Sequence, residues 1–404
     1  MPIDLPDAER GPPIPLWRWA DRQLRDLATV TGSERIAALD GLTVVGERGS
    51  ARDFEIRGRR SAGVGGSHLN PTRDGSWFAL TIMREEDRAY LPALFGKEGM
   101  EIATEVEIAA EIALHDSNDL LAKGRALGLP VACADEVPAS PPVEVLARGT
   151  QRRREPGHRP LVVDLSAIWA GPLCGHLLWL AGADVIKVEN PKRPDMIRSS
   201  DPLTFEMVNQ GKQSVAADLT DPATRDRLVA LIRGADMVIE ASRPRALRHL
   251  GIDADELVSE VPGLVWLSIT GHGATGDAAN WVGVGNDCAV AGGLTRALAD
   301  ATGEIGYVGD ALADPLTGIT AALEGWRAYA NGEAVRIGFS MSAIAAKALS
   351  EERAFDRPAL DAELRAWGAN VGKLFPKVPR RSGLGPFRDL GADTEKWLGK
   401  APAC

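Results

Sequence analysis

Residues 161–165 read LVVDL, Gly171-Pro172 opens the next segment, and residues 185–188 read VIKV; this stretch decides the fold. A short continuous apolar run is typical of a strand that is buried on both faces of a parallel sheet. Proline fits the first turn of a helix, so Gly171-Pro172 favours a helix between the two runs. The stretch therefore predicts a strand, a helix and a second, parallel strand.

The same alternation continues toward the C-terminus. Asp221-Pro222 is typical of a helix start, and Gly234 of its end. Apolar runs at residues 237–239 and 264–269 predict two further strands. Strands that alternate with single helices predict an α/β fold with a Rossmann-like, doubly wound parallel sheet, whose ligands bind at the carboxyl ends of the strands. We expect this half of the chain to bind a nucleotide-like ligand.

The chain of 404 residues is long enough for two hydrophobic cores. Residues 36–138 combine short strand-like runs with a helical region, which suggests a smaller α+β domain. A proline-rich connector at residues 137–142 and three arginines at 152–154 follow it. We predict an N-terminal segment and small domain over residues 1–155, and the large domain with a C-terminal tail over residues 156–404.

Composition and charge exclude several classes of function. The net charge is −10, with 46 basic residues against 56 acidic ones, so nucleic-acid binding is not expected. The four cysteines are far apart and form no Cys-x-x-Cys pair, so neither a disulfide framework nor a metal site is indicated. No run of about 18 apolar residues and no signal-like N-terminus is present, which predicts a cytoplasmic protein without a membrane span.

The first strand-to-helix turn does not fit a dinucleotide-binding enzyme. Residues 170–175 read AGPLCG, whereas such enzymes need Gly-x-Gly-x-x-Gly for the close approach of a pyrophosphate. Glu189, after the second strand, imitates a ribose ligand but is weak evidence alone. Structural turn glycines also explain Gly171 and Gly175. We do not expect NAD or FAD.

An ordered series of segments carries a family resemblance. In chain order these are residues 164–166 with 170–172, 182–189 (GADVIKVE), Asp195 with Arg198, residues 209–214 (NQGKQS) with 218–219, Glu240 with Arg243-Pro244, residues 268–273 (SITGHG) and 313–318 (ADPLTG). The series resembles the family III CoA-transferases, the group that contains formyl-CoA transferase, carnitine CoA-transferase and α-methylacyl-CoA racemase. The resemblance implies coenzyme A, bound as an acyl-CoA substrate, no metal, and a homodimer, which is interlaced in that family.

Asp314 stands where this resemblance implies the catalytic aspartate. Pro315 and a helical run follow it, so we expect its side chain to cap a helix and face the positive end of the dipole. That position predicts a pKa below the usual value and an ionised carboxylate that is ready to attack a thioester. A purely structural cap is the alternative, and Asp310 is the competing carboxylate.

The resemblance also implies contacts with CoA. Lys212, Arg243 and Arg198 match positions suited to its phosphates, and solvated surface charges are the alternative. The remaining implied contacts are Glu189, Ala170 and Gly171, with Gly65 and Gly66 of a short glycine segment that is equally explained as a flexible linker.

The chain departs from the family at several positions. Trp169 stands where formyl-CoA transferases carry glutamine, which argues for an acyl group bulkier than formyl unless the ring only packs under its loop. Asn286 stands where the racemases carry a histidine, and an amide cannot act as a base. Phrases that resemble the small domain, including residues 61–67, precede the large domain, so the chain looks circularly permuted or part of a fused tandem protein.

The resemblance implies an enzyme that moves CoA between an acyl-CoA and a carboxylic acid. Asp314 would form an aspartyl-acyl anhydride and then an aspartyl-CoA thioester. Two alternatives stay open. One is an isomerase, racemase or lyase that acts at the α-carbon, which Asn286 disfavours. The other is a non-catalytic CoA-binding partner subunit.

Overall fold

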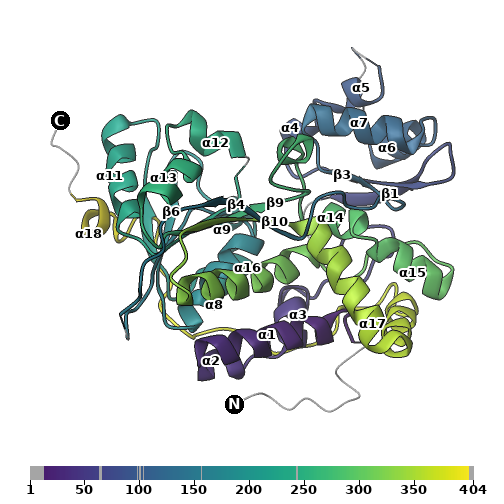
Figure 1. The fold of residues 1–404 in the computed structure, drawn as a ribbon. Helices are drawn as coiled ribbons and strands as arrows, with labels where there is room; N and C mark the ends of the chain where they lie inside the picture. The colour runs from purple at the N-terminus through teal and green to yellow at the C-terminus, as the bar shows by residue number, and fades with distance from the viewer. Residues whose placement is uncertain are drawn as a thin grey trace.

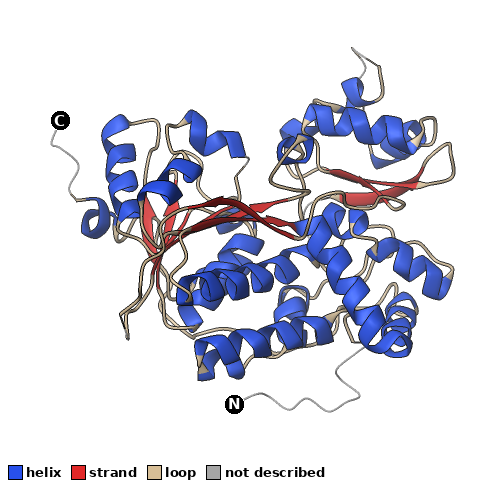
Figure 2. Ribbon diagram, in the orientation of Figure 1, coloured by secondary structure: helices blue, strands red, loops and turns tan. Residues whose placement is uncertain are grey.

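The fold contains two sheets of different size (Figure 1, Figure 2). The computed structural model describes residues 13–62, 66–97, 99, 102, 104–155, 157–242 and 244–399. The larger sheet has seven strands in the order β4-β10-β9-β8-β5-β6-β7. Their bounds are β4 Val143–Arg148, β5 Leu161–Asp164, β6 Asp184–Glu189, β7 Gln213–Ala216, β8 Met237–Glu240, β9 Val265–Thr270 and β10 Val335–Ser340.

Parallel pairing dominates the large sheet. The predicted strands β5 and β6 are neighbours, with Val162 opposite Val185 and Val163 opposite Ile186. These four side chains are at most 1% exposed, as expected for strands that are covered on both faces. Edge strand β4, which was not predicted, pairs antiparallel with β10. The predicted α/β fold with a mainly parallel sheet is confirmed.

Helices cover both faces of the large sheet (Figure 1). On one side lie α8 (Ala170–Leu180) and α16 (Ala313–Ala330), which pack closely together. On the other lie α11 (Pro222–Arg233), α12 (Pro244–His249) and α13 (Ala254–Glu260). The remaining helices after β6 are α9 Ile197–Ser200, α10 Pro202–Asn209, α14 Gly285–Ala291, α15 Leu294–Thr302, α17 Met341–Gly368 and α18 Thr394–Leu398.

The N-terminal helices pack on helices of the large sheet that come much later in the chain. Helices α1 (Trp17–Thr31), α2 (Glu34–Ala37) and α3 (Gly41–Ala51) lie below α16 in Figure 1. Buried side chains of α1, such as Leu24 and Leu27, belong to the same core as β5 and α16. These helices and β4 thus contact the large unit although they precede residue 155. The division into domains at that residue stays a prediction.

The smaller sheet contains β1 (Ser67–Pro71), β2 (Trp77–Thr81) and β3 (Val131–Cys133), all antiparallel. One face packs on α5 (Leu91–Leu94), α6 (Glu105–Ile112) and α7 (Ser117–Leu127), near the short α4 (Glu85–Arg88). This confirms the predicted smaller α+β unit. Its other face packs on α14, where Val290 and Ala291 contact the sheet's apolar residues. Helix α14 therefore lies between the two sheets.

Within the part of the chain that is described, no helix has both the length and the apolar character to cross a membrane.

Candidate active site

Asp314 is the second residue of α16, and its carboxylate lines a pocket. The predicted capping role is wrong, because Leu312 holds the cap position and no side chain caps this helix start. The backbone N–H of Asp314 donates to the carbonyl of Ala311 at 2.9 Å. Asp314 is 8% exposed, so its carboxylate faces a confined space rather than open solvent.

The pocket contains about 470 Å³ of empty space, part of which is open solvent, and it is built from segments far apart in the sequence. Arg48 comes from α3, Thr81 from the small sheet, Trp169 from the loop before α8, and Asn286 from α14. Because the small sheet, helix α3, helix α14 and the loop after β5 all contribute walls, the pocket exists only when these parts are assembled.

Burial governs the ionisation of Asp314. It raises the pKa of Asp314 to about 7, against the lowering effects of Arg48 and of the backbone N–H of Ala170. The neighbouring carboxylates of Asp310 and Asp287 raise it further. The expectation of a lowered pKa is therefore wrong, because the loss of hydration outweighs the favourable position at a helix start. A pKa near neutrality suits a group that alternates between nucleophile and leaving group.

Backbone from two other helix starts approaches the Asp314 carboxylate. Ala170, the first residue of α8, donates its N–H to it. Gly285, the first residue of α14, lies so near that a Cβ there would stand 2.1 Å from Oδ2 of Asp314 and 2.5 Å from the carbonyl oxygen of Ala311. The site therefore depends on a glycine at residue 285.

Arg48 is the main cation beside Asp314, and no sequence motif singles it out. Its guanidinium contacts Asp310 at 3.0 Å and Asp201 at 3.3 Å, and it lies 5.2 Å from the centre of the Trp169 ring. The positive charge lowers the pKa of Asp314. A lone arginine in a mixed helix carries no local signal, so only the three-dimensional pairing identifies it.

Asp310, the competing carboxylate, has a different environment. It is fully buried and receives two hydrogen bonds from Nη1 of Arg48, at 3.0 and 3.1 Å. It does not line the pocket, whereas Asp314 does. Its contacts are those of a structural ion pair.

Asn286 holds the turn that precedes α16. Its Oδ1 accepts a hydrogen bond from the backbone N–H of Ala311 at 3.1 Å. Ala311 has a positive φ of 45°, which is uncommon for a residue with a side chain. The amide therefore stabilises the backbone just before Asp314, and it supplies no base to the pocket.

Lys212 lies inside the protein rather than on an open surface. Its ammonium donates to Asp164 at 2.8 Å, to the carbonyl of Pro172 at 2.7 Å and to Asn209 at 3.0 Å. Burial lowers the pKa of Lys212 to about 8, although Asp164 opposes the shift. These contacts disfavour a direct hydrogen bond from Lys212 to a phosphate. The role of Lys212 in CoA binding stays a prediction.

Arg198 and Glu189, two further predicted CoA contacts, pair with each other. Arg198 donates to both carboxylate oxygens of Glu189, at 2.6 and 3.2 Å. Its guanidinium also lies 4.2 Å from the centre of the Phe205 ring. Glu189 is 5% exposed and accepts from the backbone N–H of Asp195. The pair fixes the loop after β6 beside α10.

The predicted glycine contacts fall in different places. A Cβ at Gly171 would stand 2.2 Å from the side chain of Ser166, so Gly171 serves the tight turn before α8. Gly66 has a φ of +54° and lines a second pocket, on the small sheet. Gly65 and Arg243 lie outside the described residues. The CoA-binding role of all four stays a prediction.

Comparisons with known proteins point to one family. Residues 160–368 match the family model described as CoA-transferase family III. Succinate–glutarate CoA-transferase of Agrobacterium fabrum is 34% identical over 171 residues, which cover 39% of this chain and 43% of that protein. Succinyl-CoA–D-citramalate CoA-transferase of Chloroflexus aurantiacus is 32% identical over 181 residues, which cover 43% of this chain and 45% of that protein.

Among solved structures, a hypothetical protein of Mycobacterium tuberculosis is 29% identical, with a TM-score of 0.45 over 50% of this chain and 60% of that one. The chain thus matches less than half of the length of either curated relative.

Proposed function

This chain belongs to CoA-transferase family III, and from that premise we propose that it moves coenzyme A between an acyl-CoA and a carboxylic acid. The observation that carries the proposal is the Asp314 carboxylate, which lines the pocket between the two sheets. No cofactor other than the CoA substrate enters this chemistry. The alternative of a non-catalytic CoA-binding partner is disfavoured by the intact carboxylate and its pocket.

Asp314 is the proposed nucleophile, and its surroundings support this role over Asp310. Asp310 forms an ion pair with Arg48 and is not among the residues that line the pocket. A pKa near 7 leaves a useful fraction of Asp314 ionised at neutral pH. Its confined setting strengthens the interactions of the developing charge with nearby backbone dipoles.

The proposed reaction proceeds by exchange at Asp314. The carboxylate attacks the thioester carbonyl carbon, the C–S bond breaks, and CoA leaves as a thiolate from an aspartyl-acyl anhydride. The thiolate attacks the aspartyl carbonyl, which releases the donor acid and leaves an aspartyl-CoA thioester. The acceptor carboxylate then attacks the aspartyl carbonyl of this thioester, the C–S bond breaks, and a second anhydride forms as the CoA thiolate leaves. The thiolate attacks the acceptor's carbonyl in this anhydride, which gives the new acyl-CoA and regenerates the Asp314 carboxylate. Every step exchanges acyl groups, so no proton or electron is consumed.

Backbone and side chains of the pocket have separate tasks in this scheme. The N–H of Ala170 points at the reacting carboxylate and is suited to stabilise an oxyanion there. Trp169 forms part of the wall and supports an acyl group bulkier than formyl. For CoA itself we keep Arg198, Arg243 and Lys212 as proposed contacts. The homodimer and the cytoplasmic location also stay predictions.

A mass measurement tests the proposal directly. The protein is incubated with a panel of acyl-CoAs that carry short, branched and dicarboxylic acyl groups, and intact mass is recorded for an adduct on Asp314. Asp221→Asn is the matched control, because Asp221 also precedes a proline at a helix start but is exposed. We expect an adduct in the native protein and in the control, and none in Asp314→Ala.

Two results would overturn the proposal. One is an adduct that persists in Asp314→Ala, and the other is the absence of both adduct and CoA exchange with every acid tested. Incorporation of solvent deuterium at the α-carbon without CoA exchange would favour the isomerase alternative instead.

A further inference from the structure

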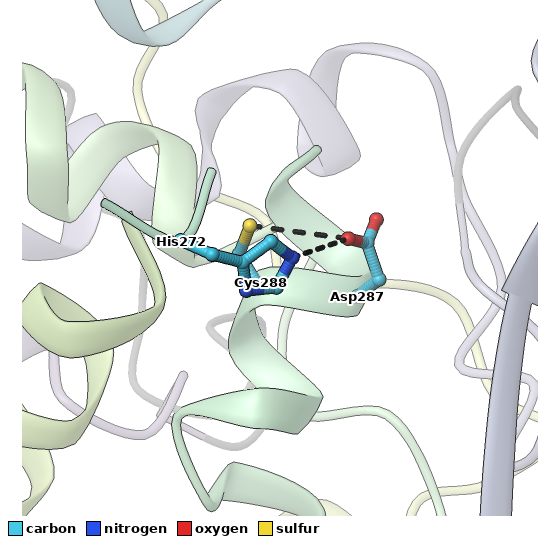
Figure 3. A group of neighbouring side chains, drawn as sticks. All are labelled: His272, Asp287 and Cys288. Atoms are coloured by element: carbon cyan, nitrogen blue, oxygen red, sulfur yellow. Dashed lines mark hydrogen bonds and ion pairs between the residues drawn. The ribbon is translucent and has the colours of Figure 1, made fainter. Parts of the chain in front are cut away.

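Three potential metal ligands meet outside the pocket lining (Figure 3). His272 follows β9, and Asp287 and Cys288 are neighbours on α14. Their ligand atoms lie within 4.8 Å of one another, and the three residues are at most 4% exposed. The proposed transfer reaction uses none of them. A cluster of this chemistry in the interior calls for a physical explanation.

The spacing of the group fits a tetrahedral metal ion better than mutual hydrogen bonds. Oδ2 of Asp287 lies 3.8 Å from Nε2 of His272 and 3.9 Å from Sγ of Cys288. The Cys288 thiol makes a long hydrogen bond to Asp287, whereas the distance between His272 and Asp287 is too long for one. Usual zinc–ligand bond lengths place neighbouring ligand atoms roughly 3.3–3.7 Å apart. The two distances from Asp287 exceed this range by a few tenths of an ångström.

One ligand atom has no hydrogen-bond partner. Among the described residues, Nε2 of His272 is buried without any hydrogen-bond partner. Leaving such a group unsatisfied costs about 1–3 kcal/mol. In Figure 3 this nitrogen faces the Asp287 carboxylate and lies beside the thiol of Cys288. An ion at the centre of the group would satisfy it.

The surrounding backbone leaves one side of the group free of side chains. A Cβ at Gly283 would stand 2.6 Å from Sγ of Cys288 and 3.0 Å from Nε2 of His272. The carbonyl oxygen of Gly271 lies 3.3 Å from the same sulfur and offers a weaker fourth donor. Glycine at residue 283 thus leaves space beside the three ligand atoms that the side chain of a larger residue would occupy.

Charge balance also favours a divalent ion. A thiolate, a carboxylate and a neutral imidazole carry two negative charges, so a divalent cation makes the buried site neutral, which avoids the cost of an uncompensated interior charge. Sulfur and imidazole donors select zinc-like ions over magnesium or calcium. On binding, the proton of the Cys288 thiol, and any proton on Asp287, passes to solvent as the metal–ligand bonds form.

We propose that His272, Asp287 and Cys288 form a structural site for a zinc-class divalent cation. The ion ties the turn after β9 to α14, whose first residues, Gly285 and Asn286, line the pocket beside Asp314. The absence of a Cys-x-x-Cys pair predicted no metal site, but these ligands come from two segments that only the fold brings together. The ion itself takes no part in the bond-making and bond-breaking steps of the transfer.

Cobalt titration tests the proposal without any activity assay. Full-length protein is stripped with a chelator and titrated with Co²⁺, whose thiolate complexes absorb in the near ultraviolet. We expect a charge-transfer band that saturates at about one equivalent, and its displacement by Zn²⁺. Cys288→Ser removes the band, whereas Cys174→Ser, the control at an equally buried cysteine, keeps it. The absence of a band in the native protein, or a band of full strength in Cys288→Ser, would overturn the site.

A second variant covers the case in which Cys288→Ser does not fold. His272→Phe removes the unpartnered nitrogen but retains an aromatic ring next to Trp281, which His272 contacts at 6.0 Å between ring centres. Zn²⁺ should raise the Tm of the native protein, because a ligand that binds only the folded state stabilises it. The same addition should leave the Tm of His272→Phe unchanged. An equal rise in both proteins would contradict the proposal.

Discussion

Gly285 lies directly against the carboxylate of Asp314, at a distance that leaves no room for a side chain. The contact joins the start of α14 to the start of α16, and the small sheet packs on α14. The position of the proposed nucleophile is therefore tied to the packing between the two sheets.

Gly285→Ala should disable the site while leaving the rest of the fold in place. Its methyl group would overlap Oδ2 of Asp314 and the carbonyl of Ala311, so the carboxylate must move. We expect a fall in kcat/KM of about 100-fold, as is usual when a reacting group is misplaced by about 1 Å. Gly234→Ala is the matched control, because a Cβ there meets nothing closer than 3.6 Å. Equal kinetics in the two variants would contradict the proposed geometry.

The rate of adduct formation should rise with pH through about 7. Burial raises the pKa of Asp314 to about 7, and only the ionised form attacks the thioester. Rapid-quench measurements between pH 5.5 and 8.5 would show the midpoint. A rate that is already maximal at pH 5.5 would mean that Asp314 is not the group that titrates.

Stability should change with pH in the opposite direction. The folded protein holds a proton on Asp314 up to about pH 7, whereas an unfolded aspartate loses it near 3.9, so the free energy of unfolding falls as pH rises between these values. Asp314→Asn removes this effect and should be more stable than the native protein above pH 7, by about 1–4 kcal/mol. Urea unfolding at pH 5 and pH 8 checks whether the difference in stability between the two proteins grows with pH.

The sequence predicted the centre of the fold better than its edges. Residues 161–164 form a largely buried strand because their apolar run suits a position covered on both faces. Strand β4 was missed because Glu144 and Arg148 interrupt its apolar residues, as befits an edge strand that is only partly buried. The packing of α1 on α16 could not be predicted either, because an apolar helix face indicates burial but not which element covers it.

The site was predictable only in part for the same reason. The helix-start position of Asp314 could be read locally, but its pKa could not, because the shift depends on burial by segments far away in the chain. Arg48 pairs with a residue 262 positions later. No spacing rule connects such residues, so their partnership appears only in three dimensions.

Arg48→Met should shift the pH dependence of adduct formation toward higher pH. The guanidinium lowers the pKa of Asp314, and its loss would leave Asp310 buried without this cation. Loss of one partner of a buried ion pair costs about 3–5 kcal/mol, so the variant should also be less stable. Arg381→Met is the control, because it breaks the buried pair with Glu47 outside the pocket. It should lose stability without moving the pH midpoint.

Trp169→Ala should change which acyl groups are accepted. Its ring forms part of the pocket wall beside Asp314, so truncation enlarges the space for the acyl chain. We expect kcat/KM for long or branched acyl-CoAs to rise at least about tenfold relative to short ones, within the range for a change in an apolar pocket. Trp179→Ala, farther along α8 and against Arg35, should leave this ratio unchanged. An unchanged ratio in Trp169→Ala would mean that the ring only supports its loop.

Lys212→Met separates a structural role for the lysine from phosphate binding. Because its ammonium bonds to Asp164, Pro172 and Asn209 in the interior, the variant should lose about 3–5 kcal/mol of stability. Adding Asp164→Asn should restore part of that loss, since the second change removes the unpaired buried charge. A structural lysine predicts that the double variant, once folded, binds CoA with a Kd close to the native one. A stable single variant with a Kd for CoA raised tenfold or more would instead show that Lys212 reaches the phosphates.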